Sequence, residues 1–235
     1  MSNDRESQHS ELLDRWLARG AMVVVVTLQF SLINDFGLGS RRLAPILELA
    51  LLVPLTALML RAEWVARRAR TREHWESATW YRRFNRVLGI AIVTIISVSN
   101  ARALFLLVQA LLAGATSNGR ALLLDSLNIW ATNIIVFSLW YWDLDRGGPS
   151  LDRLPHEGPS EFVFPQMVQP NGANTGDARP SFIDYLFLSF NTSTAFSPTD
   201  TMPLTARMKL LMMLQSTVSL LTIVLVAARA VNILA

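Results

Sequence analysis

The stretch SFNTSTAFSPTDTMPLT, residues 189–205, carries the side chains of this sequence that are best suited to bind an ion. Between residues 192 and 200 it supplies five hydroxyl groups and one carboxylate, from Thr192, Ser193, Thr194, Ser197, Thr199 and Asp200. Oxygen ligands of these types suit a hydrated cation. They suit a closed, hydrogen-bonded plug equally well, and the pattern leaves both interpretations open.

Other chemistry is poorly represented. The chain has no cysteine, and its three histidines, His9, His74 and His156, lack the spacing of zinc ligands. Asp143 and Asp145 lie close together but follow an apolar segment, so we interpret them as solvated. No nucleophile and base occur together in a local motif. We therefore expect no enzymatic activity, no metal, no cofactor and no nucleic-acid partner.

Composition indicates an all-α integral membrane protein. Of 235 residues, 51% are hydrophobic and 17% are charged, and the mean hydropathy is +0.33. Five segments are apolar enough to cross about 30 Å of hydrocarbon. They are residues 20–36, 43–60, 87–113, 121–142 and 204–233. Residues 1–19 do not resemble a removable signal and are expected to form an amphipathic lead-in helix. We predict a multi-pass protein of the cell inner membrane, in contact with lipid.

The distribution of basic residues predicts the topology. Residues 61–86, between the second and third segments, contain eight arginines and are expected to form a helical extension on the cytoplasmic side. A cytoplasmic N-terminus places 16 of the 21 basic residues on that side. The loop 143–180 then also lies in the cytoplasm. It holds six of the ten prolines and five of the eleven glycines, and it is expected to be either a packed cap or a mobile linker. Trp140, Tyr141 and Trp142 are typical of an aromatic belt at the membrane surface.

A short helix is predicted directly before the hydroxyl-rich stretch. In RPSFIDYLFLSF, Ser181 follows Pro180 as an N-cap, and Asp184 occupies the capping-box position three residues later. A helix over residues 182–194 would be about 20 Å long, too short to span a membrane. Pro198 cannot continue it, and a long helix resumes after Pro203. The chain must therefore enter, turn and leave on one side, with the helix's carboxyl end favouring a cation.

Residues 180–233 resemble the pore helix, filter and inner helix of the potassium-channel superfamily. Its pattern, Y-x-x-F-x-T-x-T-T-V-G-Y-G-D-x-x-P, places Thr192, Thr194, Asp200 and Pro203 on matching positions without a gap. The resemblance implies a homotetramer that conducts monovalent cations. It also implies a filter formed by Thr192, Ser193, Thr194, Ala195, Phe196, Ser197, Pro198, Thr199 and Asp200. The rest of the chain, including WYWDLDRGGP at residues 140–149, resembles uncharacterised multi-pass bacterial membrane proteins.

The chain departs from this family at the filter and in its orientation. Ser197 and Thr199 replace the filter glycines, and Pro198 fixes its own φ, so the stacked carbonyl rings of a potassium filter are not expected. Potassium-channel pore loops enter from outside, whereas the basic residues place this one inside. Asp200 is expected either to belong to a cation-attracting ring or to cap the last helix.

Two further features of the apolar segments are candidates for function. Polar residues recur on one face of the last helix, at Gln215, Ser219, Thr222, Val226 and Arg229, which is expected to line a pore or to form a helix interface. Arg102 is an intramembrane charge that requires a partner such as Glu48 or Asp125, in a functional site or in a structural ion pair.

These predictions divide the chain into a lead-in (1–19), a four-helix membrane region (20–142) with its basic loop (61–86), a Pro/Gly-rich loop (143–180), and a pore-loop and last-helix module (181–235). The expected fold has about five transmembrane helices plus a re-entrant pore helix and loop. We expect a tetrameric cation channel that is not selective for potassium. The alternative is a non-conducting protein that uses the pore-loop fold as a structural or sensing module.

Overall fold

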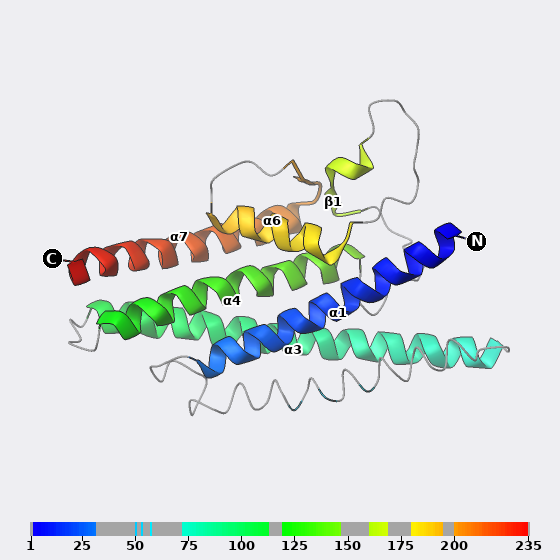
Figure 1. Cartoon of the computed structure of the whole chain (residues 1–235), viewed down its shortest axis with the longest axis horizontal. Helices are drawn as coiled ribbons and strands as arrows, with labels where there is room; N and C mark the ends of the chain where they lie inside the picture. The colour runs from blue at the N-terminus through cyan, green and yellow to red at the C-terminus, as the bar shows by residue number, and fades with distance from the viewer. Residues whose placement is uncertain are drawn as a thin grey trace.

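The computed structural model describes residues 2–31, 50, 53, 57, 72–112, 119–146, 160–168, 180–194 and 200–234. Four long helices make up most of this part: α1 (Ser2–Phe30), α3 (Arg72–Leu112), α4 (Gly119–Arg146) and α7 (Ala206–Leu234). The shorter elements are β1 (Phe162–Val163), a 3-10 helix (Pro165–Met167), α6 (Phe182–Thr194) and β2 (Met202–Pro203). Figure 1 shows the long helices side by side, with α4 antiparallel to α1, α3 and α7.

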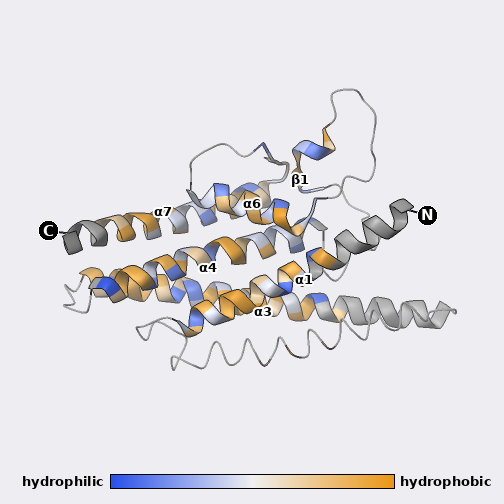
Figure 2. Ribbon diagram, viewed as in Figure 1, coloured by the Kyte–Doolittle hydropathy of each residue, from blue (hydrophilic) through white to orange (hydrophobic). Residues whose placement is uncertain are grey.

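Three of the helices contain stretches that are long and apolar enough to cross a membrane: Arg86–Leu112, Arg120–Asp145 and Ala206–Ala228. Their hydrophobic residues stand out along α3, α4 and α7 in Figure 2. The apolar part of α1, Trp16–Phe30, is shorter. The described part of the chain is therefore mostly helical and has the composition of a membrane protein. The predicted second segment, 43–60, lies almost wholly outside the described residues.

Several predicted boundaries differ from the helices. Residues 2–19, expected as a separate lead-in, and the start of the first apolar segment form one continuous helix, α1. The part of the basic loop from Arg72 onward also belongs to the helix that contains the third apolar segment. Likewise, α4 continues to Arg146, so residues 143–146 of the predicted loop are helical. Helices continue past the apolar segments because nothing in these stretches, neither proline nor glycine, interrupts them.

Helix α4 lies at the centre of the structure and contacts α1, α3, α6 and α7. Within the apolar stretch of α4, 61% of the residues are buried, against 17% in α7. A helix that is covered on nearly all sides requires partners for its polar groups as well as for its apolar ones. The polar side chains of α4 therefore need hydrogen-bond partners on the elements packed around it.

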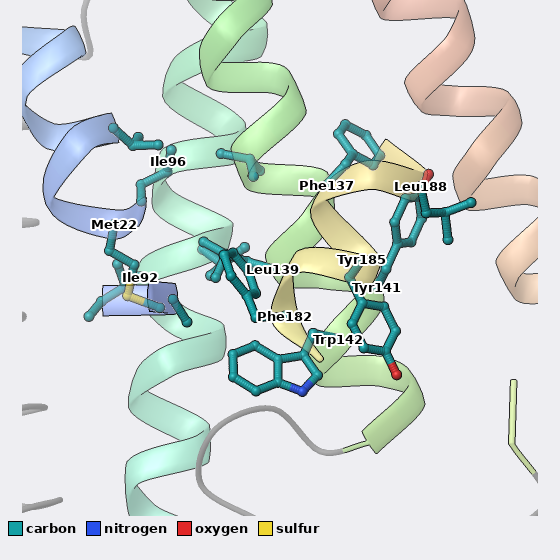
Figure 3. Packing of buried hydrophobic residues seen from close by; sticks show 14 of the residues in the cluster. Met22, Ile92, Ile96, Phe137, Leu139, Tyr141, Trp142, Phe182, Tyr185 and Leu188 are labelled. Atoms are coloured by element: carbon teal, nitrogen blue, oxygen red, sulfur yellow. The ribbon is translucent and has the colours of Figure 1, made fainter. Parts of the chain in front are cut away.

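The main core joins α4 to α1, α3, α6, β1 and the start of α7. In Figure 3, Met22, Ile92 and Ile96 lie on one side of the cluster and Tyr185 and Leu188 of α6 on the other, with Phe182 of α6 between them, beside Trp142. Aromatic pairs are frequent on the α6 side: ring centroids are 5.2 Å apart for Trp142 and Phe182, and 5.1 Å apart for Phe164 and Tyr185. Helix α6 is thus part of the core rather than an appendage.

The predicted aromatic belt at the end of α4 is wrong for two of its three residues. Tyr141 and Trp142 are buried in the core, because α6 and β1 cover this end of α4. Trp140 is partly buried, and its indole N–H donates to Ser97 Oγ on α3 at 2.9 Å. These rings hold helices together inside the protein.

The described part of the proline-rich loop is packed as a cap. Strand β1 pairs with β2 in an antiparallel ladder, with Phe162 opposite Pro203 and Val163 opposite Met202. Phe162 and Phe164 are buried, which anchors the loop in the core. Of the two predicted alternatives, a packed cap or a mobile linker, the described part of the loop is therefore a packed cap.

The end of α4, the start of α7 and Arg86 of α3 lie together at one end of the bundle, here called the basic end, and this arrangement predicts how the protein is oriented. Arg86, Arg207 and Lys209 lie at this end, together with the start of α6 and the chain's return to β2. Because lysine and arginine favour the cytoplasmic side, Asp200→Cys in the otherwise cysteine-free chain should react with an impermeant maleimide from the cytoplasm. Leu112→Cys, at the opposite end of α3, should react only from outside. Labelling of both cysteines in inside-out and right-side-out vesicles is the measurement, and the reverse pattern would show that the charge count is misleading.

Candidate functional site

The site begins at the amino end of α6, where one half of the predicted capping box is present, the bond from the Ser181 N–H to the Asp184 side chain. The backbone N–H and the hydroxyl of Ser181 donate to Asp184 Oδ2, at 2.6 and 2.9 Å. The N–H of Phe182 donates to Asp14 Oδ1 of α1 at 3.3 Å. Two carboxylates therefore lie at the positive end of the α6 dipole. Helix α6 spans Phe182–Thr194, the limits predicted from sequence.

A pair of buried carboxylates, Asp145 and Glu161, joins α4, β1, α6 and the start of α7. We call this pair the acid clasp. Asp145 Oδ1 accepts hydrogen bonds from the N–H groups of Glu161 (2.5 Å) and Phe162 (3.3 Å) and from Ser160 Oγ (3.1 Å). Its Oδ2 accepts from Tyr185 O–H of α6 at 2.5 Å. One carboxylate at the end of α4 thus holds both β1 and α6.

The second carboxylate of the clasp holds the chain that follows the site. The side chain of Glu161 accepts a hydrogen bond from Thr205 Oγ1 and forms an ion pair with Arg207 Nη2, both just before or within the first turn of α7. Its backbone carbonyl accepts from the N–H of Leu204 at 2.8 Å. Glu161 therefore fixes the start of α7 beside the end of α4.

These bonds make residues 181–204 a hairpin that begins and ends at the basic end. Helix α6 starts beside Asp14 and Asp145, and β2 lies beside β1, which Asp145 holds. In Figure 1, α6 runs along α4 and α7, and β2 is back beside β1, at the end where α6 begins. The reversal inferred from the short helix and the prolines is thus present in the fold.

The structure describes four of the nine predicted filter residues. The hydroxyl of Thr192 donates to Leu188 O at 2.8 Å, and that of Thr194 donates to Phe190 O and Asn191 O at 3.1 and 3.3 Å. Ser193 is buried and accepts a hydrogen bond from Gln215 Nε2 at 2.7 Å. All three hydroxyls thus have partners within the protein, two of them in their own helix. Ala195, Phe196, Ser197, Pro198 and Thr199 lie outside the described residues.

Asp200 is exposed and does not cap the last helix, so that alternative is wrong. Helix α7 begins at Ala206, and the N–H of Lys209 donates to Thr205 O at 3.1 Å. Pro203, predicted to open the helix, instead lies in β2. The ladder with β1 inserts extended residues between the hairpin and the helix, and this moves the helix start beyond both positions.

The polar face of α7 is directed into the protein. Gln215, Ser219 and Thr222 are buried, and Val226 is half-buried. Gln215 contacts α4 and α6, while Ser219 Oγ accepts from Asn133 Nδ2 of α4 at 2.8 Å. The hydroxyl of Thr222 donates to Val218 O of its own helix at 2.8 Å. The side chain of Arg229 lies outside the part of the chain that is described.

The intramembrane charge Arg102 lies at the surface of α3, within the stretch that is apolar enough to cross a membrane. Asp125, one of its proposed partners, is buried in α4. Glu48, the other, lies outside the described residues.

Sequence reasoning missed the acid clasp and misjudged the two aspartates at the end of α4. Asp143 and Asp145 were interpreted as solvated, but Asp145 is completely buried, and Asp143 Oδ1 lies 3.8 Å from Arg86 Nε. One signal was available: Tyr141 and Asp145 are four residues apart, so an aromatic side chain and a carboxylate share a helix face. Glu161 and Arg207 are 46 residues apart, and no local pattern connects them.

Comparison with protein-family models, curated proteins and solved structures finds no match for this chain. Among the described residues, no group of three or more His, Asp or Glu side chains is placed to hold a metal ion. The class of protein that the fold defines is a helical protein with membrane-spanning composition and a hairpin held at one end by buried carboxylates.

The acid clasp predicts a large effect of one conservative substitution. Asp145→Asn keeps the size of the side chain but removes the charge and turns one acceptor oxygen into a donor. Hydrogen bonds to charged groups contribute about 1.5–3 kcal/mol, so the free energy of unfolding should fall by about 2 kcal/mol or more. Denaturant titration in detergent micelles is the measurement. Asp200→Asn, at an exposed position, is the control and should change it by less than about 0.5 kcal/mol. Equal midpoints for the two variants would contradict the clasp.

Proposed function

We propose that the protein is a homotetrameric, cation-conducting membrane pore whose hairpin, residues 181–204, forms the conducting loop. The observation that carries this proposal is the hairpin's geometry: a helix of 13 residues enters at the basic end, and the chain returns to that end. A helix of this length spans only about 20 Å. Non-helical backbone at membrane depth is tolerated only where protein or water covers it, and a water-filled path satisfies that condition.

The charges of the hairpin favour cations. The carboxyl end of α6 points away from the basic end and presents a partial negative charge to the loop that follows. Asp200, on the returning chain, is an exposed carboxylate. Asp145 and Glu161 are already engaged within the clasp, so they add rigidity rather than an ion site. The cation is expected to meet Asp200 at the basic end and the loop after Thr194 further in.

Self-association is the second part of the proposal, because one hairpin supplies only a fraction of a pore wall. The outer face of α6 is apolar and uncovered: Ile183, Phe187 and Phe190 are 55%, 62% and 45% exposed. These residues repeat at the spacing of one helix face. A second copy of the chain covers this face and keeps lipid away from the backbone carbonyls at the end of α6.

The alternative, a non-conducting module, rests on one specific observation. The hydroxyls of Thr192 and Thr194 donate within their own helix, and Ser193 accepts from Gln215, so none of the three is free of a protein partner. Such a hairpin acts as a closed, hydrogen-bonded plug, and Asp200 is then a surface charge. Flux measurements separate the two functions.

Reconstituted liposomes provide that test. Sodium and potassium flux should be of similar size, because Ser197, Pro198 and Thr199 do not favour stacked carbonyl rings. Asp200→Asn should reduce both fluxes by removing the attraction for cations, while the assembly stays intact. Asp184→Asn is a control at the start of α6, because the carboxylate of Asp184 already accepts hydrogen bonds from the N–H and the hydroxyl of Ser181. The absence of cation flux in correctly assembled protein would support the plug, and a strong preference for potassium would contradict the filter argument.

The assembly has its own test, which again uses the cysteine-free chain. If α6 lies near the symmetry axis, a short bismaleimide should cross-link Phe187→Cys to a dimer, because one thiol per chain joins only two copies. The double variant Ile183→Cys/Phe190→Cys, with two thiols per chain on the same exposed face, should give a ladder that ends at four copies. Val98→Cys, equally exposed on α3, should give little cross-linking because α3 lies further from the axis. Gel electrophoresis of the cross-linked products from native membranes shows the ladder. A monomer at both positions would exclude the tetramer, and cross-linking at Val98 alone would place a different helix at the interface.

A further inference from the structure

Gln215 is the most highly connected polar side chain described on α7. It is completely buried, and its Nε2 lies within hydrogen-bonding distance of three acceptors on α6: Ser189 O at 2.9 Å, Ser189 Oγ at 2.7 Å and Ser193 Oγ at 2.7 Å. Its Oε1 accepts a hydrogen bond from Tyr141 O–H of α4. One amide therefore joins three helices. We call Tyr141, Ser189, Ser193 and Gln215 the amide cluster.

The direction of each hydrogen bond in the amide cluster follows from one contact. The hydroxyl of Ser189 donates to Ile134 O of α4 at 2.6 Å, so its oxygen is left to accept. The group facing Ser189 must then be a donor, which assigns Nε2 to this side of the amide and Oε1 to the side of Tyr141. Ile134 and Tyr141 are seven residues apart on α4, about two turns, and share a face. The bonds thus form a closed path from α4 through α7 and α6 back to α4.

No other side chain of similar size supplies the same set of groups. An ionised glutamate has only acceptors, and a methionine or leucine has neither donor nor acceptor of useful strength. Three acceptors around one NH₂ group share its two protons, so small rotations of α6 weaken at least one bond. Gln215 therefore constrains both the depth and the rotation of α6.

The amide cluster lies at the end of α6 that the acid clasp does not reach. Ser189 and Ser193 belong to the last turns of the helix, and Ser193 directly precedes its final residue, Thr194. Asp145 instead holds Tyr185, near the start. The carboxyl end of α6 is therefore held by α7, through the three short contacts of Gln215 and a longer bond from Ser216 Oγ to Thr192 O (3.4 Å).

We propose that Gln215 is the positioning residue of the hairpin: it holds the carboxyl end of α6 in place and thereby sets where the following loop begins. The consequence for ion flux rests on the proposed function, but the positional claim does not. The role differs from that of a general helix contact, because its partners on α6, Ser189 and Ser193, lie in the second half of the helix.

Two neighbouring residues on the same face of α7 serve as matched controls. Ser219→Ala removes a bond between α7 and α4, that from Asn133 Nδ2, without touching α6. Thr222→Val removes a buried hydroxyl whose described bond is to its own helix. If α7 merely loosens when its polar face is altered, these substitutions should act as Gln215→Met does.

The experiment follows the end of α6 directly with a single cysteine, Thr194→Cys, in the full chain in liposomes. Gln215→Met, similar in volume but without hydrogen bonds, should raise the rate of maleimide reaction at residue 194 by about tenfold. That factor corresponds to the loss of about 1.4 kcal/mol, roughly one hydrogen bond. Ser219→Ala and Thr222→Val should leave the rate within about twofold. Ser193→Ala, a milder change for the case in which Gln215→Met does not fold, should raise it less but in the same direction.

Either of two results would overturn the proposal: an unchanged rate in folded Gln215→Met, or an equal rise in Ser219→Ala. Flux is measured separately in chains that keep Thr194. In a conducting protein, Gln215→Met should change sodium and potassium flux while Ser219→Ala does not. If the wild-type protein conducts no ions, the labelling rates still decide whether Gln215 positions α6, so failure of the proposed function and failure of this inference are distinguished.

Discussion

The arrangement of the hairpin depends on the hydrogen bonds that Asp145 accepts at the buried end of α4. This carboxylate is fully buried, and unpaired it would be strongly unfavourable. It is stable because N–H and O–H donors from β1, Ser160 and Tyr185 converge on it. The same bonds bring α6, β1 and, through Glu161, the start of α7 to one place. Removing any of these elements would leave a buried acceptor unsatisfied, so they are expected to fold and loosen together.

Local signals in the sequence were sufficient for the elements but not for their contacts. The limits of α6 follow from Ser181 and Asp184 at its start and from the turn residues after Thr194, and all of these act within a few residues. The apolar stretches of α3, α4 and α7 were likewise visible as continuous runs. The strand pair β1–β2 was not, because two-residue strands have no periodicity to detect. Its presence explains why Asp200 and Pro203 do not begin the last helix.

The polar residues near the end of α4 show why burial is difficult to infer from one helix. Position alone placed Tyr141, Asp143 and Asp145 at a membrane surface, where aromatic rings and solvated charges are common. The segment that covers them lies elsewhere in the sequence, in β1 and α6, and reaches them through long-range contacts. The polar face of α7 is visible in the spacing of its residues. Its partners are not, because they lie far away in the sequence: Tyr141 is 74 residues from Gln215.

The direction of this face limits any conduction path in the proposed tetramer. Because Gln215, Ser219 and Thr222 are buried against the protein's own helices, they are not available to line a shared lumen. The exposed face of α7 consists mainly of Leu, Met, Ile and Val. It also carries two hydroxyls: that of Ser216 donates to Thr192 O at the end of α6, and that of Thr217 donates to Met213 O of its own helix. A lumen beside such a face has few polar groups beyond those two residues. Selectivity then has to arise in the hairpin, and α7 contributes by holding α6 at a fixed depth rather than by contacting the ion.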